Sequence, residues 1–171
     1  MTASGIILAL LAFAAWRDIA TRTIPDSISI AILLVGAITR LSVGWQPLGI
    51  SVAVALAVFC LLIPFQARGL VGGADLKLMA ALALGLSPLG SYQLVTAVTL
   101  LGGLLAAFYL GLRHILARVG TAPAPLGRRR GGIARRVAVI ESWRIRRNAP
   151  LPYGIAIAAG AAVVVLGHPG V

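Results

Sequence analysis

Long apolar segments are the feature that most constrains the fold of this chain. Several of them approach or exceed the roughly 20 residues that a helix needs to cross a bilayer. The segments are Ala3–Ala20, Ser27–Val43, Leu48–Phe65, Leu76–Gly90, Tyr92–Leu112 and Leu151–Gly167. Each is continuously apolar, whereas the strands of a membrane barrel alternate apolar and polar residues. The segments therefore predict membrane-spanning helices.

Composition agrees with that interpretation. The chain has 171 residues, 60% of them hydrophobic, and a mean hydropathy of +1.00. A soluble domain of this length has too little interior to bury so much apolar surface. We predict an all-α, polytopic membrane helix bundle of about six transmembrane helices, forming a single membrane-embedded domain over residues 1–171.

The basic residues predict the orientation of the bundle. Loops on the cytoplasmic side of a membrane protein are enriched in Lys and Arg. Six spans with the N-terminus outside place 14 of the 15 basic residues on the cytoplasmic side, and Arg40 is the exception. Both termini are then outside. The net charge of +11 is explained by orientation and anionic lipid, so we expect no nucleic-acid partner.

The segment 113–150 is predicted to be a basic cytoplasmic loop, because it holds ten of the arginines. Within it, Ile133–Arg147 has the pattern of a basic amphipathic helix. Such a helix either lies on anionic membrane lipid or contacts a partner or substrate.

Two carboxylates stand beside apolar segments. The chain has only four acidic residues, Asp18, Asp26, Asp75 and Glu141. A carboxylate near hydrocarbon is costly, and is therefore a candidate for function. The predicted topology puts Asp18 at the inner end of the first span and Asp75 at the inner end of the fourth, so both are at one membrane face.

Each carboxylate also has a simpler interpretation as half of an ion pair. The candidate partners are Arg17 or Arg22 for Asp18, and Lys77 or Arg68 for Asp75. Two carboxylates at one face nevertheless indicate shared chemistry, because two adjacent carboxyl groups cannot both ionise cheaply. The charged one can activate a water while the protonated one polarises a carbonyl.

No other catalytic set is apparent. Cys60 is the single cysteine and lies in an apolar segment, and no Cys/His set has metal-ligand spacing. We expect no metal and no cofactor.

Other motifs have structural and functional interpretations. Gly72-Gly73 allows close approach of a ligand or a flexible start to the fourth span. Asp26, after Pro25, is predicted to be an N-cap, with a catalytic role as the alternative. Pro152-Tyr153-Gly154 is either an ordinary helix start or a wall of the substrate cleft.

Three stretches together resemble the type IV prepilin peptidases, and most of all the short forms that serve tight-adherence (Flp-type) pili. Asp18 with Ile24-Pro25-Asp26 is similar to the first block of the family. Gly72-Gly73-Ala74-Asp75, followed by Lys77, is similar to the second, and Leu151–Ala156 to a Pro-Tyr-Gly stretch. Order and spacing agree over nearly the whole chain.

The resemblance implies an aspartic endopeptidase of the bacterial inner membrane that removes prepilin or pseudopilin leaders at the cytoplasmic face. It implies that Asp18 and Asp75 are catalytic. The residues that it implies bind substrate or shape the site are Gly72, Gly73, Ala74, Lys77, Pro25, Asp26, Tyr153 and Gly154. Longer relatives carry a zinc-binding insertion and N-methyltransferase activity, which we do not expect here.

Two departures from the family pattern fall close to the implied site. Ala74 stands where glycine is usual, which is expected to stiffen a loop or slow cleavage. Asp26 stands where asparagine is usual, which adds a third carboxylate.

Two other functions are compatible with the sequence. One is a small proton-coupled transporter, although relay carboxylates are expected nearer the midplane of the membrane. The other is a non-catalytic pilus assembly subunit. The oligomeric state is not predicted.

Overall fold

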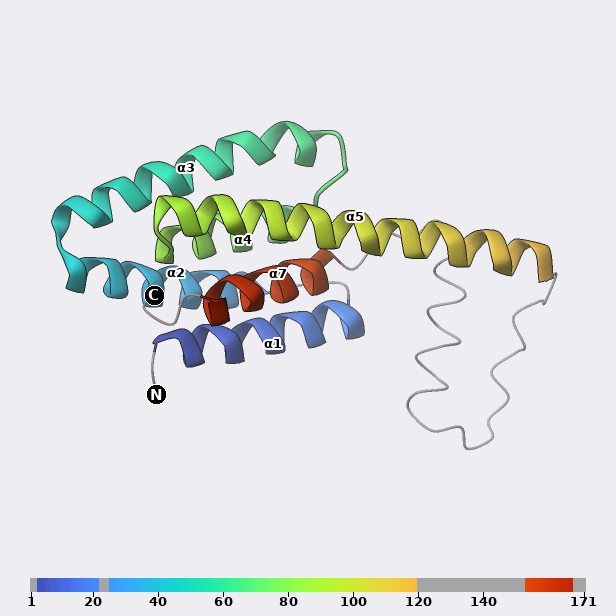
Figure 1. Cartoon of the computed structure of the whole chain (residues 1–171), viewed down its shortest axis with the longest axis horizontal. Helices are drawn as coiled ribbons and strands as arrows, with labels where there is room; N and C mark the ends of the chain where they lie inside the picture. Colours follow the sequence, from blue (N-terminus) through green and yellow to red (C-terminus); the bar gives the residue numbers. More distant parts are fainter. Residues whose placement is uncertain (1–2, 22–24, 120–152, 168–171) are drawn as a thin grey trace. The chain divides into compact units, whose positions relative to one another are not determined.

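The computed structural model describes residues 3–21, 25–119 and 153–167. Its described residues form six helices (Figure 1), which confirms the all-α prediction for this part of the chain. The helices are α1 (Ala3–Thr21), α2 (Asp26–Val43), α3 (Trp45–Ala67), α4 (Gly73–Gly85), α5 (Pro88–Val119) and α7 (Tyr153–Gly167).

The chain divides into two compact units. The first contains α1 to α4, α7 and the part of α5 up to Gly102. The second begins at Gly103 and contains the remainder of α5. Helix α5 continues to Val119, past the predicted start of the basic loop at residue 113. The predicted amphipathic helix at 133–147 lies outside the described residues.

Three described helices are long and apolar enough to cross a membrane: α2, α3 and the Pro88–Leu112 part of α5. On α3, Ser51, Ala55 and Val58 form one buried stripe, while Leu56 and Leu61 on other faces are exposed. Exposed apolar side chains of this kind suit a lipid environment. A topology of six spans with both termini outside stays a prediction.

Helix α4 is the most enclosed helix of the first unit. Eight of its 13 residues are buried, and it packs against α2, α3 and α7. At 1.5 Å per residue it is about 20 Å long, shorter than the roughly 30 Å of a hydrocarbon core. It therefore serves as the packing centre of the unit.

Glycines allow close contact between these helices. A Cβ on Gly36 of α2 would lie 2.8 Å from the Cα atom of Gly85 on α4. A Cβ on Gly160 of α7 would lie 2.7 Å from Cγ2 of Val98 on α5. Small residues at such crossings let backbones approach closely, which is how apolar helices gain contact energy in a membrane.

The fourth predicted segment was wrong at its end, because α4 stops at Gly85 and not at Gly90. Ser87 supplies the break. Its Oγ accepts a hydrogen bond from the Gly90 backbone N–H at 3.1 Å, as an N-cap does, and Pro88 follows in the first helical position of α5.

Buried hydroxyls satisfy the carbonyls at the C-terminal end of α4. Ser51 Oγ donates to the Leu86 carbonyl at 3.2 Å, and Ser91 Oγ donates to the Ala83 carbonyl at 3.1 Å. Both serines are 1% exposed. Helix ends leave carbonyls without intrahelical partners, and water is scarce in an apolar bundle, so these bonds let α4 end inside the unit.

The turn from α3 to α4 is a Schellman motif. Gly69 has φ of +71°, and its N–H donates to the Gln66 carbonyl at 2.9 Å. The Leu70 N–H donates to the Phe65 carbonyl, also at 2.9 Å. Glycine tolerates this left-handed conformation without strain. The motif ends α3 and leads the chain to Gly72 and the start of α4.

We expect Gly36→Ala to destabilise the protein in detergent. Its methyl group would contact the backbone of Gly85, which cannot move aside, so the expected loss is about 1–3 kcal/mol, or several degrees in Tm. Gly49→Ala on α3 is the matched control, since its Cβ has no atom within 4 Å. That change should raise Tm slightly through helix propensity. Equal Tm values for the two variants would contradict the close packing of α2 on α4.

Candidate active site

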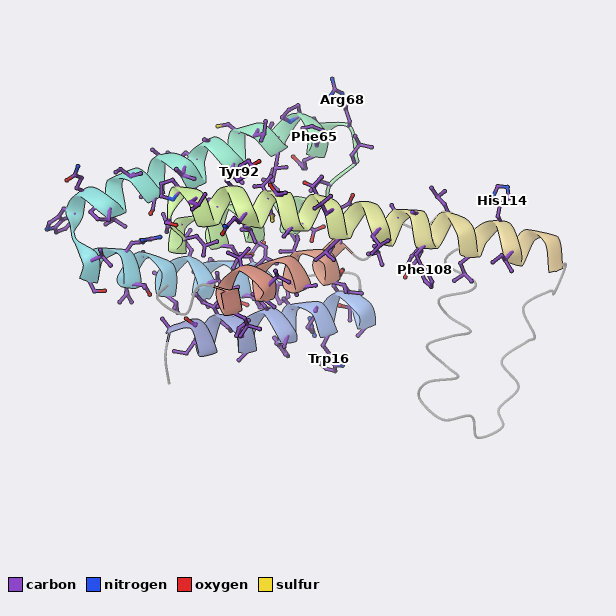
Figure 2. The ribbon with its side chains drawn as sticks, viewed as in Figure 1. Trp16, Phe65, Arg68, Tyr92, Phe108 and His114 are labelled. Atoms are coloured by element: carbon purple, nitrogen blue, oxygen red, sulfur yellow. The ribbon has the colours of Figure 1, made fainter. Side chains whose placement is uncertain are left out.

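Asp18 continues the buried face of α1. The buried apolar residues Ile7, Leu11 and Ala14 precede it at helical spacing, and Asp18 itself is only 7% exposed. Trp16, two positions earlier, is on the opposite side of the helix. It is 60% exposed and points away from the neighbouring helices in Figure 2. The fold of α1 thus turns one carboxylate inward.

The buried carboxylate is held by the first turn of α7. The Gly154 backbone N–H donates to Asp18 Oδ2 at 2.9 Å, joining residues 136 positions apart. A Cβ on Gly154 would lie 2.8 Å from that oxygen and 3.0 Å from both Cβ and Cγ of Asp18. Glycine is therefore required here for the contact between α1 and α7. Figure 1 shows these two helix ends at the same end of the first unit.

Tyr153 packs against α5. A Cβ on Gly102 would lie 2.9 Å from Cε1 of the Tyr153 ring. Gly102 was not among the predicted site residues. The sequence indicates this contact only weakly, because Gly102-Gly103 is one of several glycine pairs in the chain. The two glycines also differ in the structure, since a Cβ on Gly103 would meet no atom within 4 Å.

Asp75 lies in the first turn of α4, ahead of the apolar residues that begin at Leu76. Its carboxylate folds back to accept a hydrogen bond from the backbone of Gly72, the N-cap residue. This is the acidic half of a capping box. A Cβ on Gly72 would lie 2.8 Å from Asp75 Oδ2, so glycine at 72 leaves room for the carboxylate.

The two carboxyl groups interact electrostatically. Burial first, and then the charge of Asp18, raise the pKa of Asp75 from 3.8 to about 6, against the opposing effect of the Gly72 hydrogen bond. The negative charge of Asp18 therefore favours the protonated form of Asp75. An ionised carboxylate beside one that retains its proton can activate a water and polarise a carbonyl together.

Ala74 and Gly73 lie beside Asp75 in the first turn of α4. Ala74 lies within helix α4 and packs against the apolar core, so the expectation that it stiffens a loop was wrong. A Cβ on Gly73 would meet only Gln66 Nε2, at an ordinary 3.6 Å. Of the two adjacent glycines, only Gly72 is sterically tied to Asp75.

Asp26 was predicted to be the N-cap of α2, and this was wrong. Pro25 is the N-cap residue, without a side-chain bond, and Asp26 is the first residue of the helix. Its Oδ2 instead accepts from Lys77 Nζ at 2.8 Å, where the two side chains are 60% and 51% exposed. Lys77 is therefore paired with Asp26 and not with Asp75. The ion pair links the starts of α2 and α4.

Within the described residues, no group of three or more His, Cys, Asp or Glu side chains is placed to hold a metal ion. The chemistry that these residues support is that of two carboxyl groups in different surroundings at one end of a helix bundle.

A family model for the type IV leader peptidase family matches residues 5–111. The chain belongs to this family. It is an aspartic peptidase family whose members are embedded in the membrane, in agreement with the apolar helices. Neither a curated protein nor a solved structure gives a match.

The match covers Asp18, Asp75 and the Asp26–Lys77 pair of this leader peptidase family member, and it ends before α7. Gly154, which the resemblance implied to shape the site, lies outside the matched residues, and the fold brings it into contact with Asp18.

Gly72→Ala is expected to lower leader cleavage at least tenfold with little change in Tm. The added methyl would displace the end of a flexible side chain, the Asp75 carboxylate, and would not touch backbone. Gly73→Ala is the matched control, and should retain activity. Equal cleavage by both variants, measured as loss of leader mass, would show that the position of Asp75 does not depend on Gly72.

Asp75→Asn is expected to stabilise the protein at pH 8 and to have no effect at pH 4. The pKa of Asp75 is raised from 3.8 to about 6, so folding favours the protonated form and stability falls as pH rises through this window. Asparagine carries no charge at either pH. At full value the shift corresponds to about 3 kcal/mol, which the partial exposure of Asp75 reduces to roughly 1 kcal/mol, so the expected gain in Tm at pH 8 is about 2–4 °C. A variant less stable than wild type at pH 8 would contradict the raised pKa.

Proposed function

We propose that this protein is a prepilin leader peptidase of the Flp type, acting at the cytoplasmic face of the bacterial inner membrane through Asp18 and Asp75. The observation that carries the proposal is the electrostatic coupling of two partly or fully buried carboxyl groups in a chain of the leader peptidase family. Each group comes from a different helix, and each is oriented by a backbone N–H.

In the first step, a water is activated between the two groups. The water gives a proton to the Asp18 carboxylate as its oxygen bonds to the scissile carbonyl carbon. Asp75 gives its proton to the carbonyl oxygen. The product is a neutral gem-diol, with Asp18 now protonated and Asp75 ionised.

In the second step, the carbon–nitrogen bond breaks. The proton on Asp18 goes to the leaving nitrogen, and Asp75 takes a proton from one hydroxyl of the gem-diol. The products are a carboxylic acid at the end of the leader and the free amine of the mature pilin. Both aspartates return to their starting states, so the cycle needs no metal or cofactor.

The substrate class fits the surroundings of the site. A prepilin or pseudopilin carries an apolar helix behind its leader. The exposed apolar side chains of α2 and α3 suit a lipid environment, and such a substrate helix would lie in the same environment. The basic segment 113–150 is proposed to bind anionic lipid or the pilin. No N-methyltransferase activity is proposed, since the chain holds no set of cysteines for a zinc-binding insertion.

The decisive experiment is co-expression with a candidate Flp-type prepilin, with leader loss read by mass. Asp18→Asn and Asp75→Asn should each abolish cleavage, with a loss on the order of 1,000-fold or more, while the proteins still insert in the membrane. Asp26→Asn is the matched control. It should retain activity, because Asp26 is exposed and paired with Lys77.

Other outcomes would point elsewhere. Full processing by either of the first two variants would remove that residue from the site, and loss of cleavage in Asp26→Asn would add Asp26 to it. Pilus assembly supported by the double variant would favour a non-catalytic subunit, and proton-dependent flux in proteoliposomes a transporter.

A further inference from the structure

We propose that the first turn of α7, through the Gly154 N–H, holds Asp18 as the ionised general base, which leaves Asp75 as the general acid. This inference rests on the proposed function and assigns a role to each carboxyl group. It makes Gly154 a positioning residue, since it acts on the reaction through Asp18.

Burial alone would assign the roles the other way round. Asp18 is 7% exposed, whereas Asp75 is only partly buried, and desolvation favours the neutral form of the more buried acid. Asp18 also lies in the last turn of α1, where the helix dipole disfavours negative charge. A specific interaction must therefore favour the charged form of Asp18.

The start of α7 supplies that interaction. Gly154 is the second residue of the helix, so its N–H has no intrahelical acceptor and is free to bind a side chain. It points at Asp18 Oδ2 over 2.9 Å in a buried setting, and the α7 dipole adds partial positive charge at the same place. A hydrogen bond to an ionised acceptor is about twice as strong as one between neutral groups.

Among the described residues, the charged groups near Asp18 come from the helices that pack against α1, from α4 and from α1 itself. On α4 the neighbouring charge is Asp75, which is coupled to it, and Lys77 is paired with Asp26 of α2. The described residues of α7 have no charged side chain, and their titratable Tyr153 packs against Gly102. Arg17 precedes Asp18 on its own helix. The N–H of Gly154 is therefore the contact to change.

The first test compares pH profiles of kcat/KM for leader cleavage in wild type, Gly154→Ala and Gly160→Ala. The methyl at 154 would push Asp18 away from the N–H that favours its charged form, so the acidic limb of the profile should move to higher pH by about one unit. Gly160→Ala is the matched control on the same helix. It should lower Tm through Val98, 2.7 Å from its Cβ, with no shift in the limb.

The proposal would be overturned if the acidic limb of the kcat/KM profile of Gly154→Ala stayed at the wild-type pH, or if the limb of Gly160→Ala moved by the same amount. A purely structural role for Gly154 predicts the same lower Tm in both variants and an unshifted profile in each.

The second test needs neither a substrate nor a folded Gly154 variant. At pH 5, the infrared carbonyl band of a protonated carboxylic acid should be present in wild type, kept in Asp18→Asn and lost in Asp75→Asn. Loss of the band in Asp18→Asn, or the same response in both variants, would overturn the role assignment. If the infrared result holds and no prepilin is cleaved, the proposed function fails while the charge assignment stands.

Discussion

A carboxylate buried among apolar helices needs a donor, and this requirement links the parts of the first unit. Asp18 continues a stripe of buried apolar residues on α1, so water cannot easily solvate it. The Gly154 N–H replaces that water, which requires the start of α7 to lie against the end of α1. The close approach in turn requires residue 154 to have no side chain.

The same use of local donors and acceptors recurs at α4. Its N-terminal end uses the Asp75 carboxylate to satisfy the backbone of Gly72, and its C-terminal end uses the hydroxyls of Ser51 and Ser91. A helix of 13 residues can thus end inside an apolar bundle. The cost falls on Asp75, whose charged form is disfavoured by burial and by Asp18. A carboxyl group that retains its proton closer to neutral pH has the property that a general acid needs.

The ion pair with Lys77 gives Asp26, the third carboxylate, a partner of its own, unlike the interacting Asp18 and Asp75. An exposed aspartate with its own cation is not forced to share a proton with Asp18 or Asp75. The departure from the usual asparagine is therefore accommodated by an ion pair, and the departure at Ala74 by a helical position where alanine is the best helix former. The contacts that the structure shows for the two interacting acids are the backbone of Gly154 for Asp18 and that of Gly72 for Asp75.

The sequence by itself determined the helical class and the family, and it indicated Asp18 and Asp75 as candidates, because apolar length and scarce acids are visible in one dimension. It placed the end of α4 at about Gly90, because the apolar residues run on past Gly85 even though Ser87-Pro88 interrupts them. The sequence also could not predict that Lys77 forms its ion pair with Asp26, 51 positions away. Only the tertiary structure decided that Gly154 binds Asp18 and that Gly72, not Gly73, makes room for Asp75, because these contacts depend on which glycine the fold places against each carboxylate.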